Sequence, residues 1–329
     1  MLNDSLLNKS VNQLKSNASV RKIVDRMPRK LKVSLRQAID KATTRKPQAQ
    51  IVGELNAQNT LLSQLLYEMA LRTERNQEQK RLINYGFKVY SQHDEDGIIE
   101  EIFRRIGSTD RFFVEFGVGD GLENCTLYCL LKGWSGVWID GSAICVTAIE
   151  QKFRYLMKAE RLKVRYAFIT ADEIEEHFQE LGVPEEFDLL SVDIDNNDYW
   201  VWKSITHYRP RVVAIEYNAS FRCTNSVVPH NPTAIWDYTN YFGAGLKALE
   251  VLGKEKGYCL VGCNYTGVTA FFVREDLVAS LFAEPFSAEN HYEPPRYFVR
   301  MPNGHPPGFG PVVEATTQDG ARQSPWSHQ

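Results

Sequence analysis

The chain has 329 residues, of which 43% are hydrophobic and 24% charged, and its formal net charge is −3. This composition is ordinary for a protein that buries a full core, and no run of about eighteen uncharged apolar residues occurs, so we expect no transmembrane helix. The first residues lack an apolar segment with a small-residue cleavage site, and the six cysteines form no CxxC pair. We therefore expect a cytoplasmic protein with reduced thiols.

Residues 1–50 are strongly basic, with twelve Lys/Arg against three Asp/Glu, whereas the remainder has 26 basic and 38 acidic residues. The sequence thus predicts a basic N-terminal arm over 1–50. Such an arm can contact an anionic membrane surface or another polyanion, act as a mitochondrial-type presequence, or simply be solvated. The acidic remainder argues against nucleic acid as a partner.

Residues 51–84 contain no proline and only Gly53, and they predict a helical segment. Leu55, Leu62, Leu65 and Met69 fit a short a/d seam of the coiled-coil type. The segment either forms a homodimer through residues 51–83 or packs on the domain that follows it.

Strands and helices alternate from residue 85 to residue 283. A helix over 91–107 comes first, followed by alternating strands and helices at 112–118, 122–132, 136–140, 143–158, 163–169, 171–181, 187–194, 198–206 and 211–218. A loop over 222–233 and a helix over 239–256 then lead to paired strands at 258–264 and 269–274. This order predicts an α/β fold: a Rossmann-like seven-stranded, mostly parallel sheet with an antiparallel edge hairpin. Residues 284–329 predict an irregular C-terminal tail, disordered at its end.

A glycine-rich turn follows the first strand. Glu115 precedes Gly117, Gly119 and Gly121 in an E-x-G-x-G-x-G run, and Asp140 ends the next strand. Glycines at this position let a ligand approach the backbone. A dinucleotide fingerprint would need G-x-G-x-x-G, and the preceding acid suits a cationic amine rather than a phosphate. Asp140 is placed to accept both hydroxyls of a ribose.

This stretch resembles motif I and the second acidic site of the class I methyltransferases, which use S-adenosylmethionine. The resemblance covers roughly residues 85–280. It implies that the three glycines cradle the cofactor, that Glu115 faces its amine side and that Asp140 holds its ribose. It further implies cofactor contacts for Gln92 and Asn124. The alternatives are a plain tight turn flanked by acids and a dinucleotide site.

A second acidic region follows the fourth and fifth strands of the sheet. Asp193, Asp195 and Asp198 follow one strand, and Glu216 and Asn218 end the other. Oxygen ligands from adjacent strand ends suit Mg²⁺ or another divalent cation, and we expect Asp193, Glu216 and Asn218 to hold it. The alternative is that these side chains are helix caps.

The same region resembles two methyltransferase branches. One is the metal-dependent catechol- and caffeoyl-CoA-type O-methyltransferases, in which a strand-end acid and an Asp-Asn pair hold Mg²⁺. The other is the FkbM-type enzymes, which methylate hydroxyls of sugars, and Ser91-Gln92…Asp96 matches their lead-in. Neither branch's base is present, because Asn196 and Asn197 replace the lysine and the histidine. Asp193, Asp195, Asp198 and the loop residue His230 are therefore the candidate catalytic residues.

Aromatic residues at the start of the predicted helix over 239–256 are candidate sugar contacts: Trp236, Tyr238, Tyr241 and Phe242. These features together predict a metal-assisted, S-adenosylmethionine-dependent O-methyltransferase acting on a sugar or surface glycan. The alternatives are a non-catalytic scaffold in a glycan-assembly complex and a nicotinamide-dependent oxidoreductase.

Overall fold

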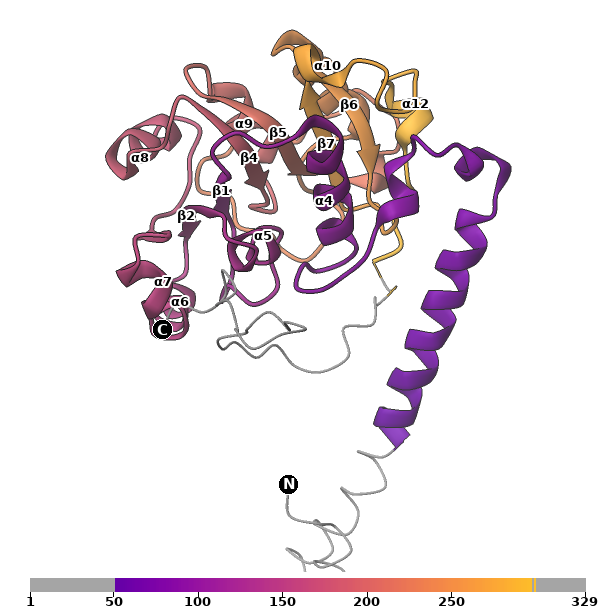
Figure 1. Ribbon diagram of the computed structural model, residues 1–329, viewed down its shortest axis with the longest axis horizontal. Coiled ribbons are helices and arrows are strands. Elements are labelled where there is room, and N and C mark those ends of the chain that lie inside the picture. Colours follow the sequence, from indigo (N-terminus) through magenta and orange to yellow (C-terminus); the bar gives the residue numbers. More distant parts are fainter. Residues whose placement is uncertain (1–50, 298, 300–329) are drawn as a thin grey trace, which may run out of the picture. The chain divides into compact units, whose positions relative to one another are not determined.

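The computed structural model describes residues 51–297 and 299 (Figure 1). The basic arm over 1–50 and the end of the C-terminal tail lie outside these residues. In the described part the strands are β1 (Phe112–Phe116), β2 (Ser135–Asp140), β3 (Leu162–Tyr166), β4 (Glu186–Val192), β5 (Arg209–Glu216), β6 (Tyr258–Cys263) and β7 (Thr269–Arg274). The strands form one seven-stranded sheet in the order β3-β2-β1-β4-β5-β7-β6.

The sheet has the predicted mixture of directions. The pairs β1–β2, β1–β4, β2–β3 and β4–β5 are parallel, and β7 is antiparallel to both β5 and β6. Parallel neighbours require crossovers, which the intervening helices supply. The α/β fold with a hairpin at the sheet edge is therefore confirmed. The strand order reverses between β1 and β4, and ligands bind at such a switch point in open α/β sheets.

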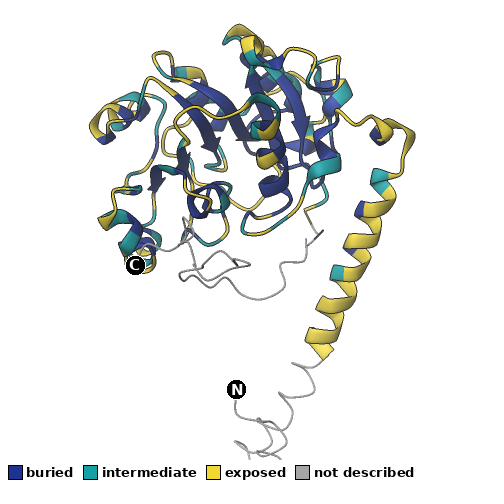
Figure 2. Cartoon of the chain, in the orientation of Figure 1, coloured by how far each residue is buried: buried dark blue, intermediate teal, exposed yellow. Residues whose placement is uncertain are grey.

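Helices cover both faces of the sheet. They are α4 (Glu95–Ile106), α5 (Leu127–Leu131), α6 (Ala143–Lys152), α7 (Arg154–Lys158), α8 (Ile174–Leu181), α9 (Asp198–Ser204), α10 (Leu246–Glu255), α11 (Glu275–Val278) and α12 (Ala288–His291). One apolar cluster joins α8, α9 and α10 to one face, and a second joins α4 to α7 to the other. Successive strand residues point to opposite faces of the sheet and so belong to different clusters. Val213 belongs to the first cluster, and its neighbour Val212 to the second. The strands other than the edge strand β3 are accordingly buried on both faces (Figure 2).

Three predicted helices differ most from the observed ones, and the helices predicted over 91–107 and 171–181 also begin later, at Glu95 and Ile174. The helix predicted over 143–158 breaks at Phe153 into α6 and α7. The helix predicted over 122–132 begins only at Leu127, and that predicted over 239–256 begins only at Leu246. Before α5 and before α10, side chains from other parts of the chain form hydrogen bonds with the backbone and hold it in a loop. Asn218 Nδ2, for example, donates to the carbonyls of Asn240 and Phe242.

Residues 51–71 form a continuous helix, and 3₁₀ turns follow at Glu74–Gln77 and Leu82–Tyr85. Within residues 60–299, the Tyr67 hydroxyl donates to the Ile83 carbonyl at 2.8 Å, and Arg75 forms an ion pair with Glu293 at 2.6 Å. The first bond lies within the segment before the sheet, and the second ties this segment to the chain that follows α12. No helix in the described ranges combines the length and apolarity that crossing a bilayer requires.

Candidate active site

A cavity of about 710 Å³ opens at the carboxyl ends of β1, β2, β4 and β5. The glycine turn, the strand ends and the loop before α10 all contribute to its wall. The lining residues are Gln92, His93, Gly117, Val118, Gly119, Asp120, Glu123, Ile139, Asp140, Gly141, Ala167, Phe168, Ile169, Asp193, Ile194, Asp195, Asn197, Glu216, Ala234, Trp236, Phe242, Val268 and Tyr297. The predicted glycine turn and the predicted acidic region therefore share one cavity.

The three glycines of the turn have positive φ angles of +80°, +56° and +74°, which side chains rarely adopt. Gly117 and Gly119 line the cavity, and a Cβ on Gly119 would meet nothing within 4 Å. Gly121 does not line it. A Cβ at Gly121 would instead lie 2.9 Å from the Trp138 ring, so this glycine lets the turn pack on the core.

Glu115 lies behind the turn and is not part of the cavity wall. Its carboxylate accepts hydrogen bonds from the backbone N–H groups of Cys125 and Thr126 and from the hydroxyls of Thr126 and Ser191. Burial raises the pKa of this carboxyl, and these donors act in the opposite direction. Glu115 therefore shapes the loop from within. Its predicted place on the amine side of the cofactor stays a prediction.

Asp140 lines the cavity at the end of β2. Its Oδ2 accepts the Gly119 N–H at 2.8 Å and its Oδ1 accepts the Ser142 N–H at 2.7 Å. Burial raises the pKa of Asp140, and the two backbone donors lower it. The side chain thus joins the glycine turn to the start of α6, and each carboxylate oxygen still has a lone pair for a ligand hydroxyl.

The loop before α4 contributes Gln92 and His93 to the cavity wall. Lys88 Nζ donates to the Gln92 carbonyl at 2.9 Å and pairs with Glu123, which lies in the glycine-turn loop, at 2.6 Å. This ion pair links the loop before α4 to the glycine-turn loop. Asn124 is not in the lining, and its Oδ1 accepts the N–H of Leu127 at the start of α5.

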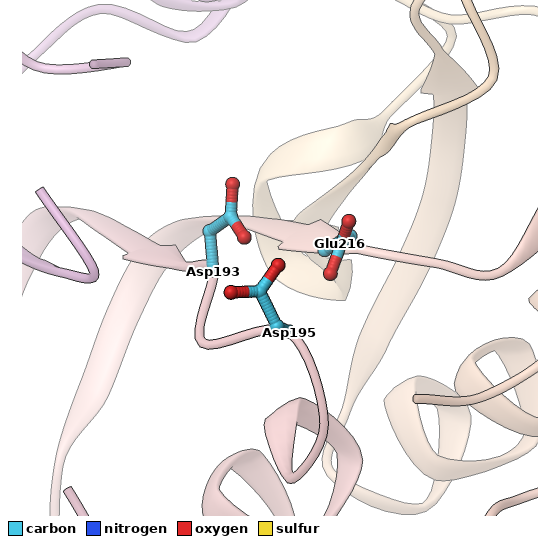
Figure 3. A group of neighbouring side chains, drawn as sticks. All are labelled: Asp193, Asp195 and Glu216. Carbon is cyan, nitrogen blue, oxygen red and sulfur yellow. The ribbon is translucent and has the colours of Figure 1, made fainter. Parts of the chain in front are cut away.

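Asp193, Asp195 and Glu216 form a carboxylate cluster on the far side of the cavity. One oxygen from each lies within 4.8 Å of the others, and Figure 3 shows the three side chains converging from the ends of β4 and β5. No hydrogen bond from another described residue reaches these carboxylates, and Glu216 Oε2 is a buried atom without a partner. Burial raises the pKa of Asp193 and of Glu216 well above the ordinary value, and the neighbouring acids raise both further.

The other residues predicted as metal ligands or catalytic residues lie outside the carboxylate cluster. Asn218 is fully buried, and its amide is bonded to the backbone of Asn240, Phe242 and Ser220, which leaves Asp195 as the third member of the cluster. Asp198 begins α9, is outside the lining and accepts the Ile194 N–H at 2.8 Å. Burial raises its pKa to about 7. His230 lines a neighbouring cavity of about 340 Å³ and stacks on Trp200.

The structure adds residues that the sequence did not single out. Tyr297 reaches the cavity from the segment predicted to be an irregular tail. Arg296 fixes this segment, because its backbone N–H donates to the Thr266 carbonyl at 2.8 Å and its guanidinium lies 4.2 Å from the centre of the Tyr265 ring. Phe168, half exposed after β3, lies on the Asp140 side. Of the four aromatic residues predicted as sugar contacts, Trp236 and Phe242 line the cavity and Tyr238 and Tyr241 do not.

Comparison with known proteins gives matches among solved structures alone, since no family model and no curated protein matches the chain. The plantazolicin methyltransferase BamL, in complex with a desmethyl analogue and S-adenosylhomocysteine, matches at TM-score 0.38 and 11% identity, over 65% of this chain and 90% of that one. The N-terminal domain of EvdMO1, in the presence of S-adenosylhomocysteine and D-fucose, matches at 0.37 and 14%, over 61% and 95%.

A third structure, magnesium protoporphyrin IX methyltransferase from Synechocystis PCC 6803 with bound S-adenosylmethionine, matches at TM-score 0.37 and 9% identity, over 55% of this chain and 77% of that one. Similarity at this level assigns neither a family nor a substrate to the chain.

Proposed function

We propose that this protein is an S-adenosylmethionine-dependent methyltransferase. The charge of the cavity is the observation that carries the proposal. Among its lining residues Asp120, Glu123, Asp140, Asp193, Asp195 and Glu216 are acids, and none is Lys or Arg. Asp120 and Glu123 are paired with Lys152 and Lys88, so Asp140 and the carboxylate cluster are the lining acids without a lysine or arginine partner among the described residues. Such a wall attracts the sulfonium and ammonium groups of S-adenosylmethionine, whereas the pyrophosphate of a nicotinamide cofactor would meet charge of its own sign.

The other walls suit the rest of this cofactor. Gly117 and Gly119 give access to the backbone, and the free lone pairs of Asp140 are available to the two ribose hydroxyls. Ile139, Phe168 and Ile169 supply an apolar surface beside Asp140 for the adenine ring. When bound, S-adenosylmethionine supplies an electrophilic methyl group. The chain's own task is then to align the acceptor and to exclude water.

We further propose that Asp193, Asp195 and Glu216 hold a divalent cation such as Mg²⁺. The donor set fits, because all the ligands are carboxylate oxygens and no described residue donates a hydrogen bond to them. Bound there, the cation would lower the pKa of an acceptor hydroxyl. Because burial raises the pKa of Asp193 and Glu216, each is also a stronger proton acceptor than an exposed carboxylate.

The acceptor we propose is a hydroxyl of a sugar or surface glycan. Trp236, Phe242 and Tyr297 share the cavity with the carboxylate cluster, and aromatic faces of this kind pack against sugar rings. Asn197, in the same wall, offers an amide, although its Nδ2 already donates to the Asn231 carbonyl. We propose methylation of oxygen because the carboxylates of the cluster line the same cavity and can accept the proton that a hydroxyl loses.

Isothermal titration with S-adenosylhomocysteine tests the core of this proposal. We expect binding of the folded full-length chain, and we expect NADH to leave that binding unchanged when it is added as a competitor. Absence of binding by folded protein, or displacement by NADH, would reject the proposed cofactor.

A further inference from the structure

One side of the helix over residues 51–71 is apolar and exposed. In heptad notation Ile51, Leu55, Gln58, Leu62, Leu65 and Met69 occupy successive a and d positions, and we call this stripe the leucine seam. Its apolar members are Ile51, Leu55, Leu62, Leu65 and Met69, which are 55%, 52%, 55%, 53% and 58% exposed. Monomeric proteins rarely leave so continuous an apolar stripe in water.

The opposite side of this helix is already in use. Tyr67, at an f position, is 9% exposed, and its hydroxyl donates to the carbonyls of Ile83 and Gly86. Its ring packs edge-on against Tyr265 with 4.8 Å between centroids. Because positions f and a/d point in opposite directions, this anchor leaves the leucine seam available to a second molecule.

The charges of the helix select the kind of partner. Residues 51–71 contain two acids, Glu54 and Glu68, and no Lys or Arg. Helices that lie on an anionic membrane carry basic residues on their polar side, so this helix lacks the chemistry for a lipid surface. A three-heptad seam with leucine at three of its six core positions and isoleucine or methionine at two others matches another copy of itself instead.

The same charges also select the direction of pairing. Glu54 and Leu61 occupy g positions, with Asn59 and Leu66 at the following e positions, and Glu68 occupies the last g position, near the end of the helix. In a parallel pair, g faces the e position of the partner, which brings Leu61 against Leu66 and Glu54 against the uncharged Asn59. An antiparallel pair would face g with g and bring Glu54 towards Glu68, which is unfavourable.

We propose that the leucine seam is a self-association interface through which two copies of the chain form a parallel two-stranded coiled coil. Gln58 is the one polar residue in the core of the seam. A single polar core residue fixes the register and the number of strands at some cost in stability. The glutamines of the two copies would face each other.

Light scattering on the full-length chain at about 20 μM tests the proposal, with the double variant Leu62→Glu/Leu65→Glu and the matched control Gln64→Glu, which adds charge outside the seam. We expect a dimer for the wild type and the control. The double variant should be a monomer, with a dimer Kd raised about a hundredfold or more. Its circular dichroism and its thermal melting at low concentration should match those of the wild type.

Direction is tested with Leu55→Cys. In a parallel pair the two new thiols face each other, so mild oxidation should give a covalent dimer that the wild type does not give. A monomeric wild type, or a dimer that survives the double substitution, would overturn the proposal. So would leucine-dependent binding of a monomeric wild type to vesicles of phosphatidylcholine and phosphatidylserine, which would make the seam a membrane contact.

Discussion

Gly117 lies against the main-chain carbonyl of Asp193, so closely that a Cβ at residue 117 would come within 1.5 Å of that oxygen. The turn after β1 and the end of β4 are therefore fitted to each other at this glycine. The close approach places the glycine turn beside the carboxylate cluster, and it makes residue 117 the most demanding position of the turn.

We expect Gly117→Ala to lower the free energy of unfolding by about 3 kcal/mol or more, because the new methyl group displaces the end of β4. Gly119→Ala is the matched control, since it has positive φ but open space, and it should cost about 1 kcal/mol. Urea unfolding and titration with S-adenosylhomocysteine check both. Equal stabilities for the two variants would contradict the fitted contact.

Asp140→Ala should weaken S-adenosylhomocysteine binding about 10- to 100-fold. The change removes the acceptor proposed for the ribose, and it leaves the N–H groups of Gly119 and Ser142 without their partner. Isothermal titration gives the affinity. Asp172→Ala, an exposed acid outside the cavity wall, should bind as the wild type does, and a wild-type affinity for Asp140→Ala would remove Asp140 from the cofactor site.

Mg²⁺ should bind the chain with release of protons. Burial and the neighbouring acids raise the pKa of Asp193 and of Glu216, so a cation competes with protons for these carboxyls and its affinity should rise with pH. Calorimetry in buffers of different ionisation enthalpy measures the proton release. Asp193→Asn should lower the affinity at least about tenfold, whereas Asp120→Asn, a cavity acid paired with Lys152, should not. Equal affinities in the two variants would argue against the metal site.

Asp94 should make the protein less stable as the pH rises towards 9. Burial, followed by the charge of Glu95, raises its pKa to about 8, against about 3.9 in an unfolded chain. Between these values the folded state binds the extra proton, so the free energy of unfolding falls as the pH increases.

Asp94→Asn keeps an acceptor for the Tyr265 N–H and cannot ionise. Urea unfolding in EDTA should show that the variant gains about 2 kcal/mol or more of stability relative to the wild type between pH 6 and pH 9, because the wild type alone loses stability over this range. An identical difference at both pH values would exclude titration of Asp94 as the cause.

The sheet was predictable because its signals are local. Buried strands alternate with helices between glycine and polar breaks, and the direction of each crossover follows from general rules. The glycine spacing and the place of Asp140 at the end of β2 depend on the same short-range pattern. For these reasons both walls of the cavity could be assigned to strand ends from the sequence.

Long-range contacts explain the features of the site that could not be predicted from the sequence. Which N–H groups the Glu115 carboxylate accepts depends on the path of a ten-residue loop, and no periodicity encodes that path. Asn218 is a predicted metal ligand because of its position after β5. Its amide group instead donates to backbone carbonyls that lie some twenty residues later in the chain. Tyr297 comes from a segment without secondary-structure signals, held by Arg296 and by the Glu293 carbonyl, which accepts from the Tyr217 hydroxyl.

The pairing of Arg75 with Glu293 has a practical consequence for expression. A shortened gene that starts at residue 85, where the alternating pattern begins, would omit Arg75 and Tyr67 together. Glu293 would then keep Arg296 as its one remaining ion-pair partner among the described residues. The Tyr265 ring, on which the Arg296 guanidinium packs, would lose its contact with Tyr67. Trimming at the boundary that the pattern suggests would thus loosen the distant segment from which Tyr297 lines the cavity, and a useful shortened version should begin before Thr60.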